Sequence, residues 1–194
     1  MKNFTKIFFA VLIVSLFFFV GCSKKDSNVL TVGATPEPHA AMLKLVEDNL
    51  AEEGITLKVI DFTDYVTPNE ALEGGQLDAN FFQHLPYMDS FNAERGYHLV
   101  NAGGIHIEPV ALYSKKISSV DEIKDGATIA IPNDPTNEGR ALLLLQSAGL
   151  IKLDENAGIT ATPQNIVENP KNIKFHEIEA ASLPRVLLDV DAAV

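Results

Sequence analysis

The chain is 194 residues long and carries 15 basic against 26 acidic residues, a formal net charge of −11 at pH 7. An acidic surface without any basic cluster longer than a pair repels phosphate backbones, which excludes nucleic acid as the main partner. The single Cys leaves no internal disulfide, so an ordinary hydrophobic core must stabilise the one domain or two small domains that this length allows.

A secretory signal peptide is predicted at residues 1–21. Lys2 and Lys6 precede an almost wholly apolar stretch at residues 7–20, which is too short to span a membrane. Removal of the signal takes away two basic and no acidic residues, so the net charge falls from −11 to −13. After the signal, the sequence contains no apolar stretch long enough to cross a membrane.

The only Cys lies at the end of this apolar stretch. The sequence Phe19-Val20-Gly21-Cys22 resembles a bacterial lipobox, although Phe19 stands where Leu is usual. A lone Cys is otherwise most often a buried, inert residue, but this position favours a lipid on Cys22 as the first residue of the mature protein. We therefore expect a polar tether at residues 22–28 and an extracytoplasmic protein held on the cell membrane by its lipid, on the periplasmic side or the outer cell surface.

Strand and helix patterns alternate beyond the tether. Strands are expected at residues 29–33, 56–62, 77–81 and 105–113, and helices at residues 40–53, from 67 to the Gly74-Gly75 pair, and at 84–95. In the first of these helices Met42, Leu45, Val46 and Leu50 share one face. This order predicts a first α/β lobe at residues 29–113, with a mainly parallel sheet and helices on both faces.

A second series of the same kind follows a polar segment, residues 114–126, which we interpret as a solvated link. Strands are expected at residues 128–131, 173–178 and 190–194, and helices at residues 137–148 and 180–188. They predict a second α/β lobe at residues 127–194, with the ligand cleft between the lobes at the carboxyl ends of the strands. Because the chain stops inside an expected buried strand, we expect it to be C-terminally truncated and to bind its ligand more weakly than an extended version.

Aromatic residues are concentrated in the first lobe. Tyr65 and Phe82 each follow closely after an expected strand, so both lie near a carboxyl end of the sheet, where a ligand would bind. Phe81 and Phe91 are interpreted as core residues instead, because burial is the ordinary role of Phe.

A candidate carboxylate site lies at the start of the helix at residues 137–148. A strand runs into a loop with two prolines and then into a helix whose first turn carries Asn137 and Arg140. The unpaired N–H groups of a helix N-terminus and the fork of an Arg both bind a carboxylate. The spacing alone leaves a second interpretation open, in which this is a capped surface helix with a solvent-facing Arg.

Four blocks of sequence, in order along the chain, resemble the methionine-binding lipoproteins of bacterial ABC importers, the NlpA lipoprotein family. The blocks are VGATPEPH (residues 32–39), FTDYVTPN (62–69), LDANFFQHLPY (77–87) and PNDPTNEGR (132–140). The resemblance implies a type II periplasmic-binding-protein fold and L-methionine or a close relative as ligand. It also implies delivery of that ligand to a membrane permease and its ATPase subunits.

The resemblance also implies roles for individual residues. It places Tyr65, Phe82, His84 and Tyr87 around the thioether side chain and Asn137 and Arg140 at the amino-acid head group. His84 stays open between a ligand contact and a structural residue, and His39 is interpreted as a cap or wall residue.

An enzyme and a metal-binding protein are the two alternative classes of function. The sequence has no G-x-S-x-G, H-E-x-x-H or P-loop motif, so we expect neither an enzyme nor a cofactor. A metal-binding lipoprotein remains the alternative, but its possible ligands lack paired spacing, so no metal site is predicted: His39, His84, His98, His106 and His176. Within the proposed class the ligand also stays open. D-methionine, a methionine dipeptide or another apolar amino acid would present the same carboxylate and a similar tail, and one methylene distinguishes apolar ligands by only ~1–3 kcal/mol.

Overall fold

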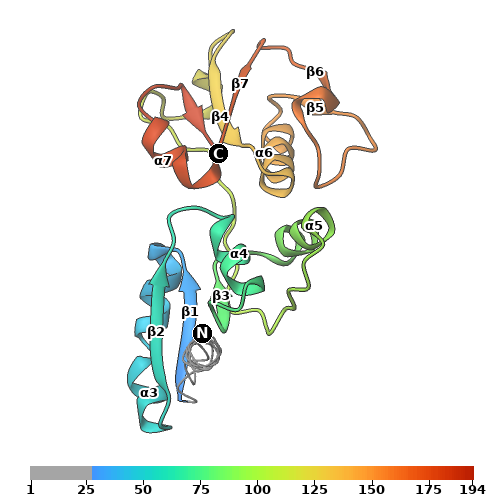
Figure 1. Ribbon diagram of the computed structural model, residues 1–194. Coiled ribbons are helices and arrows are strands. Elements are labelled where there is room, and N and C mark those ends of the chain that lie inside the picture. Colours follow the sequence, from blue (N-terminus) through green and yellow to red (C-terminus); the bar gives the residue numbers. More distant parts are fainter. Residues whose placement is uncertain (1–27) are drawn as a thin grey trace, which may run out of the picture.

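The computed structural model describes residues 28–194, which form two α/β lobes placed end to end (Figure 1). The expected signal peptide, residues 1–21, and Cys22 lie outside the described residues, as does the tether up to residue 27. Within residues 28–194, no helix is long and apolar enough to cross a membrane.

The first lobe is built on a three-stranded parallel sheet. Its order is β2-β1-β3, with β1 (Val29–Ala34) between β2 (Thr56–Asp61) and β3 (Ala79–Phe81). The register places Val32 opposite both Val59 and Ala79. The carboxyl-terminal part of β1, up to Ala34, is buried because a strand lies on each side of it. Both pairs are parallel, as predicted from the sequence.

Two helices of this lobe agree with the sequence and one does not. α4 (Thr67–Glu73) and α5 (Leu85–Arg95) lie where they were expected. The prediction of one continuous helix at residues 40–53 is wrong. The chain there forms a turn, η2 (Pro36–Ala40), followed by two short helices, α2 (Ala41–Lys44) and α3 (Glu47–Glu52).

The break in this helix falls at Leu45 and Val46, and the Leu45 side chain is 81% exposed. Helices this short gain little stability on their own and depend on packing against a core. An apolar face that is packed in this way holds successive turns in one straight helix. Among the described residues nothing covers Leu45, so packing does not hold the two pieces in one line.

The chain crosses between the lobes in an extended segment, residues 100–112, where the sequence predicted a strand at residues 105–113. That prediction is wrong, because in the described chain only Tyr113 pairs, as a single antiparallel bridge with Ala193. The alternation of Ile105 and Ile107 imitates a strand, but Ile107 is 90% exposed and no described strand lies beside it to take up its backbone hydrogen bonds.

The second lobe repeats the arrangement. β4 (Thr128–Pro132) lies between β7 (Lys174–Ile178) and β8 (Ala192–Ala193), with both pairs parallel. α6 (Pro135–Ser147) packs on this sheet and starts two residues before the expected position, because Pro135 follows an Asp134 cap. Fully buried side chains of β4 and α6 form the core: Ile129, Ile131, Leu142 and Leu145.

The remaining segments also belong to the second lobe. The polar stretch at residues 114–126 is not a solvated link, because it forms η3 (Val120–Glu122) and buries Ile123 in the core. The helix expected at residues 180–188 is shortened to η5 (Ala180–Ser182) and α7 (Leu183–Val186). Three further pieces were not predicted, being too short for a periodic signal: β5 (Lys152–Leu153), η4 (Pro163–Asn165) and β6 (Ile166–Glu168).

Candidate functional site

On the first lobe, aromatic rings gather where β2 and β3 end and α5 begins. Tyr65 follows β2, Phe82 follows β3 and Tyr87 lies on α5, with ring centroids 5.8 to 6.5 Å apart. The Tyr87 hydroxyl donates a 2.9 Å hydrogen bond to the Tyr65 carbonyl, and Phe91 packs on the other side of Tyr87. We call Tyr65, Phe82, Tyr87 and Phe91 the aromatic cluster; it joins three predicted ligand residues to one predicted core residue.

The aromatic cluster faces the second lobe. Burial raises the pKa of the Tyr65 phenol, and the negative charges of Glu108 and Asp134 raise it further. Burial also raises the pKa of Tyr87, again with a contribution from Asp134. Asp134 lies at the start of α6, and it lines the same hollow as Tyr87, so the aromatic cluster lies close to that end of the helix.

On the second lobe, the first two turns of α6 carry a chain of hydrogen bonds. The Asp134 carboxylate caps the helix by accepting from the Asn137 backbone N–H and also from the Asn137 side-chain amide, each at 3.0 Å. The Asn137 side-chain oxygen accepts from Arg140 Nη1 at 3.0 Å, and Arg140 Nη2 donates to the Glu108 carbonyl at 2.7 Å. Arg140 is therefore half-buried and turned toward the crossing segment, in contrast to the solvent-facing interpretation.

His84 lies beside the aromatic cluster on the first lobe. It is the residue before α5, and its ring centroid is 6.5 Å from that of Tyr87. Burial lowers the pKa of His84, as does the positive charge of Arg140, whereas Asp134 opposes both. Within the described residues its Nε2 is buried and has no hydrogen-bond partner, which is unusual for a buried polar atom.

A hollow opens between the lobes beside these residues. Tyr87 and Arg95 of α5 line one wall, and Asp134 and Thr136 at the start of α6 line the other. Of the six residues predicted to contact the ligand, only Tyr87 lines this hollow. The others lie outside its lining, on the first lobe (Tyr65, Phe82 and His84) and on α6 (Asn137 and Arg140). An aromatic wall opposite a helix N-terminus suits a small molecule with an apolar tail and a carboxylate.

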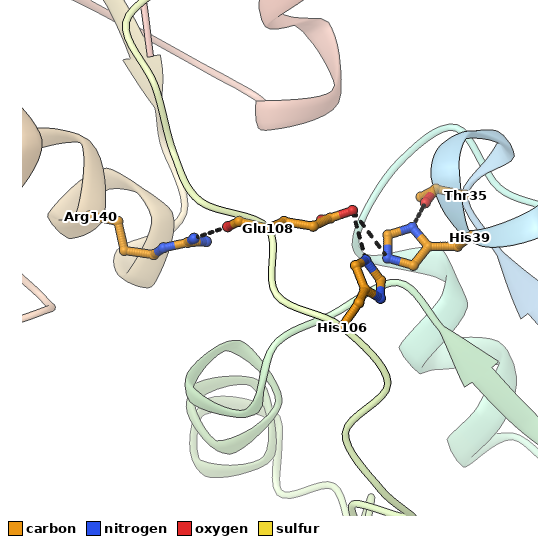
Figure 2. Close-up of polar contacts among 5 residues, drawn as sticks. All are labelled: Thr35, His39, His106, Glu108 and Arg140. Carbon is orange, nitrogen blue, oxygen red and sulfur yellow. Dashed lines mark hydrogen bonds and ion pairs between the residues drawn. The ribbon is translucent and has the colours of Figure 1, made fainter. Parts of the chain in front are cut away.

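A second polar group, which the sequence did not reveal, lies on the crossing segment (Figure 2). Nε2 of His106 is 3.0 Å and Nε2 of His39 is 3.8 Å from Oε1 of Glu108. His39 is buried, and its Nδ1 is 2.6 Å from the Thr35 hydroxyl. Burial lowers the pKa of His39, although the charge of Glu108 acts in the opposite direction.

The expectation of scattered histidines is therefore wrong for His39 and His106, whose ring centroids are 5.2 Å apart. They come together because the crossing segment passes the end of β1, which no local sequence pattern reports. The one available signal was the His-x-Glu spacing of His106 and Glu108.

Comparison with known proteins gives relatives over most of the chain. The D-methionine-binding lipoprotein MetQ of Salmonella typhimurium is 48% identical over 175 residues, covering 90% of this chain and 65% of that relative. The chain thus spans about two thirds of the length of these curated relatives.

Solved structures of relatives also match most of the chain. A nutrient-binding protein from Burkholderia cenocepacia bound to methionine matches with a TM-score of 0.80 and 51% identity, covering 85% of this chain and 70% of that one. A periplasmic substrate-binding protein of an ABC transporter from Coxiella burnetii matches with a TM-score of 0.80 and 46% identity, covering 84% of this chain and 69% of that one. The two-lobed, periplasmic-binding-protein-like fold predicted from the sequence is confirmed.

The profile of one family, described as NlpA lipoprotein, matches residues 30–194, nearly all of the described chain. Together with relatives of almost one half identity, this match confirms the resemblance seen in the four sequence blocks. The chain belongs to the NlpA lipoprotein family.

Proposed function

We propose that this protein is a lipid-anchored, extracytoplasmic substrate-binding protein that captures methionine and delivers it to an ABC importer. The observation that carries the proposal is a hollow between the lobes, lined by Tyr87 and Phe91 of the aromatic cluster and by the start of α6. The methionine bound in the Burkholderia cenocepacia protein and the name of the Salmonella relative support this choice of ligand.

The aromatic side of the site suits a thioether. Sulfur is polarisable and packs favourably near ring edges, at about 0.3–1.5 kcal/mol per contact. We assign Tyr65, Phe82 and Tyr87 to this side, with the unpartnered Nε2 of His84 at its margin. The hydrogen bond from Tyr87 to the Tyr65 carbonyl holds two of the rings in place before a ligand arrives.

The polar side suits an amino-acid head group. A guanidinium has five N–H donors, and the structure shows two of those of Arg140 in hydrogen bonds, to Asn137 and to the Glu108 carbonyl. These two bonds fix the plane of the guanidinium, whose other N–H groups are left for a ligand carboxylate. Charge pairing of this kind offsets the cost of taking a carboxylate out of water between two lobes.

The proposed transport role needs a membrane anchor and membrane partners. Cys22 is the proposed lipid attachment site, which would hold the binding protein near a permease and its ATPase subunits. Lipoprotein relatives and an ABC-transporter relative support this part of the proposal. The relatives are named as binding proteins, so the role is capture and delivery of a ligand and not catalysis.

Isothermal titration calorimetry of the purified protein tests the proposal. We expect saturable binding of methionine. Norleucine replaces the sulfur by a methylene and loses the ~0.3–1.5 kcal/mol sulfur contact, so its affinity should be roughly 2- to 10-fold lower than that of methionine. L-Methionine, D-methionine and a methionine dipeptide are titrated separately, because the predicted L form and the D form in the relative's name are not distinguished by the two walls. Native mass spectrometry of freshly purified protein identifies any retained ligand. Absence of binding by all three ligands would refute the proposal.

A further inference from the structure

Two imidazoles and one carboxylate converge where the chain crosses between the lobes (Figure 2). His39 comes from the first lobe, just beyond β1, whereas His106 and Glu108 lie on the crossing segment. One ligand atom from each of the three lies within 4.8 Å of the other two. These residues are separate from those assigned to methionine, so they are free to serve another purpose.

We propose that His39, His106 and Glu108 bind a divalent transition-metal ion of the zinc class. Two imidazole nitrogens and one carboxylate oxygen form a donor set that zinc prefers and that magnesium and calcium do not. Three protein ligands leave the fourth tetrahedral position open to water or to a small solute. The Glu108 side chain is 49% exposed, so this position is reached from solvent.

The distances fit such an ion. With metal–ligand bonds of about 2.0–2.2 Å, neighbouring atoms of a tetrahedral site lie roughly 3.3 Å apart. The two distances from Glu108 Oε1, 3.0 Å to His106 and 3.8 Å to His39, lie on either side of this value. The third distance, between the two imidazole nitrogens, is at most 4.8 Å, so binding would also draw His106 of the crossing segment toward His39.

The structure also holds His39 in position. Its Nδ1 is 2.6 Å from the Thr35 hydroxyl, and its ring lies edge-on to Phe81 with centroids 4.7 Å apart. When Nδ1–H donates to Thr35, the lone pair of Nε2 points at the Glu108 carboxylate. Metal-bound histidines use such a second hydrogen bond to fix the ring and its tautomer.

A cation would favour one tautomer of His39. In the tautomer with Nδ1–H the lone pair of His39 Nε2 and the carboxylate of Glu108 face each other without a proton between them, which is unfavourable, whereas the tautomer with Nε2–H avoids this contact. A divalent ion would convert this repulsion into two bonds. The acidic chain, with 26 Asp and Glu against 15 Lys and Arg, raises the local concentration of cations around it.

Titration of zinc ion into metal-free, untagged protein tests the site, with cobalt absorption spectra reporting the coordination geometry. We expect one equivalent of zinc to bind and cobalt to give the intense visible bands of a tetrahedral site. His106→Ala and Glu108→Gln should each weaken binding about tenfold or more, and Thr35→Val by about 10- to 100-fold through loss of the supporting hydrogen bond.

His98→Ala is the matched control. His98 and Glu73 form a similar pair at 3.0 Å on the surface of the first lobe, outside the three proposed ligands. This variant should bind zinc as the wild type does. Because His39 is buried and its replacement can unfold the lobe, the decision rests on His106 and Glu108, with a thermal melt of each variant to confirm folding.

Absence of zinc binding, or equal affinity in the wild type, His106→Ala and Glu108→Gln, would overturn the proposal. Either result would leave the methionine proposal untouched, because the three ligands lie outside the side chains assigned to methionine. Failure of methionine binding would likewise leave the zinc titration interpretable.

Discussion

Arg140 joins the second lobe to the crossing segment through a single side chain. One of its N–H groups donates to the Asn137 side chain within α6, and another donates to the Glu108 carbonyl on the crossing segment. The guanidinium is therefore oriented before a ligand binds, which reduces the entropic cost of binding.

Replacement of Arg140 by Ala should weaken methionine binding by roughly 30- to several-thousand-fold, because loss of one partner of a buried charge pair costs about 2–5 kcal/mol. Arg140→Lys should recover only part of this, since an ammonium cannot make two parallel hydrogen bonds. Calorimetry measures the three affinities. An Arg140→Ala affinity within about threefold of the wild type would show that Arg140 does not bind the carboxylate.

Glu138, next to the site, is a buried carboxyl group only 5% exposed, and within the described residues its Oε1 has no hydrogen-bond partner. Burial raises the pKa of Glu138 to about 7, with smaller contributions from the charges of Glu177 and Asp134. Its ordinary value is 4.5, so the folded protein binds this proton more tightly than the unfolded chain does.

The stabilising contribution of this proton is fully present below pH 4.5 and is lost as the pH rises through about 7. Glu138→Gln stays neutral at every pH, so its stability relative to the wild type should increase between about pH 5 and pH 8, by at most about 3 kcal/mol. Urea unfolding of both proteins at each pH measures the difference. A difference that does not change with pH would mean that Glu138 titrates normally.

At the scale of elements, α6 organises the second lobe because it carries both core and site residues. Leu142 and Leu145 are fully buried against β4, while Asn137 and Arg140 lie in the first two turns. Gly139 precedes Arg140, at a close approach of α6 to the loop around Ile159.

A Cβ on Gly139 would overlap the backbone carbonyl of Ile159, and backbone atoms cannot rotate away as a flexible side chain can. Gly139→Ala should therefore destabilise the protein by roughly 1–3 kcal/mol or more, despite the better helix propensity of Ala. Gly158→Ala is the control, because a Cβ there meets nothing within 4 Å. Equal thermal stability of the two variants would show that the loop yields without cost.

At the scale of the whole molecule, the proposed anchor is the feature that relates the binding site to a membrane. The described residues contain no helix that could span a bilayer, and the chain carries a net charge of −11. Such an acidic surface is repelled by anionic lipid headgroups.

Cys22→Ala should therefore move the protein from the membrane fraction to the soluble fraction and abolish its labelling with radioactive palmitate. Methionine affinity should be unchanged, because the residues assigned to the ligand lie in the two lobes. Fractionation of cells and calorimetry of both proteins provide the two measurements. A variant that stays with the membrane would disprove lipid attachment at Cys22 as the anchor.

Local sequence signals predicted many of the elements correctly. β1, β4 and α5 were found because their apolar runs, prolines and closing glycine act over a few residues, as Gly96 does with its φ of +67° at the end of α5. The same signals failed at residues 40–53 and 105–113. There the apolar pattern was present, but the described chain offers no surface or strand to pair with it.

The sequence by itself determined the family, the two-lobed α/β class and the residues of the proposed methionine site, because these depend on patterns and motifs that are continuous along the chain. Only the tertiary structure decided which side chains meet across the crossing segment. His39, Glu108 and Arg140 are far apart in sequence, yet Glu108 contacts His39 through its side chain and Arg140 through its backbone (Figure 2). Such contacts depend on the path of the chain between two lobes, and no local periodicity carries that information.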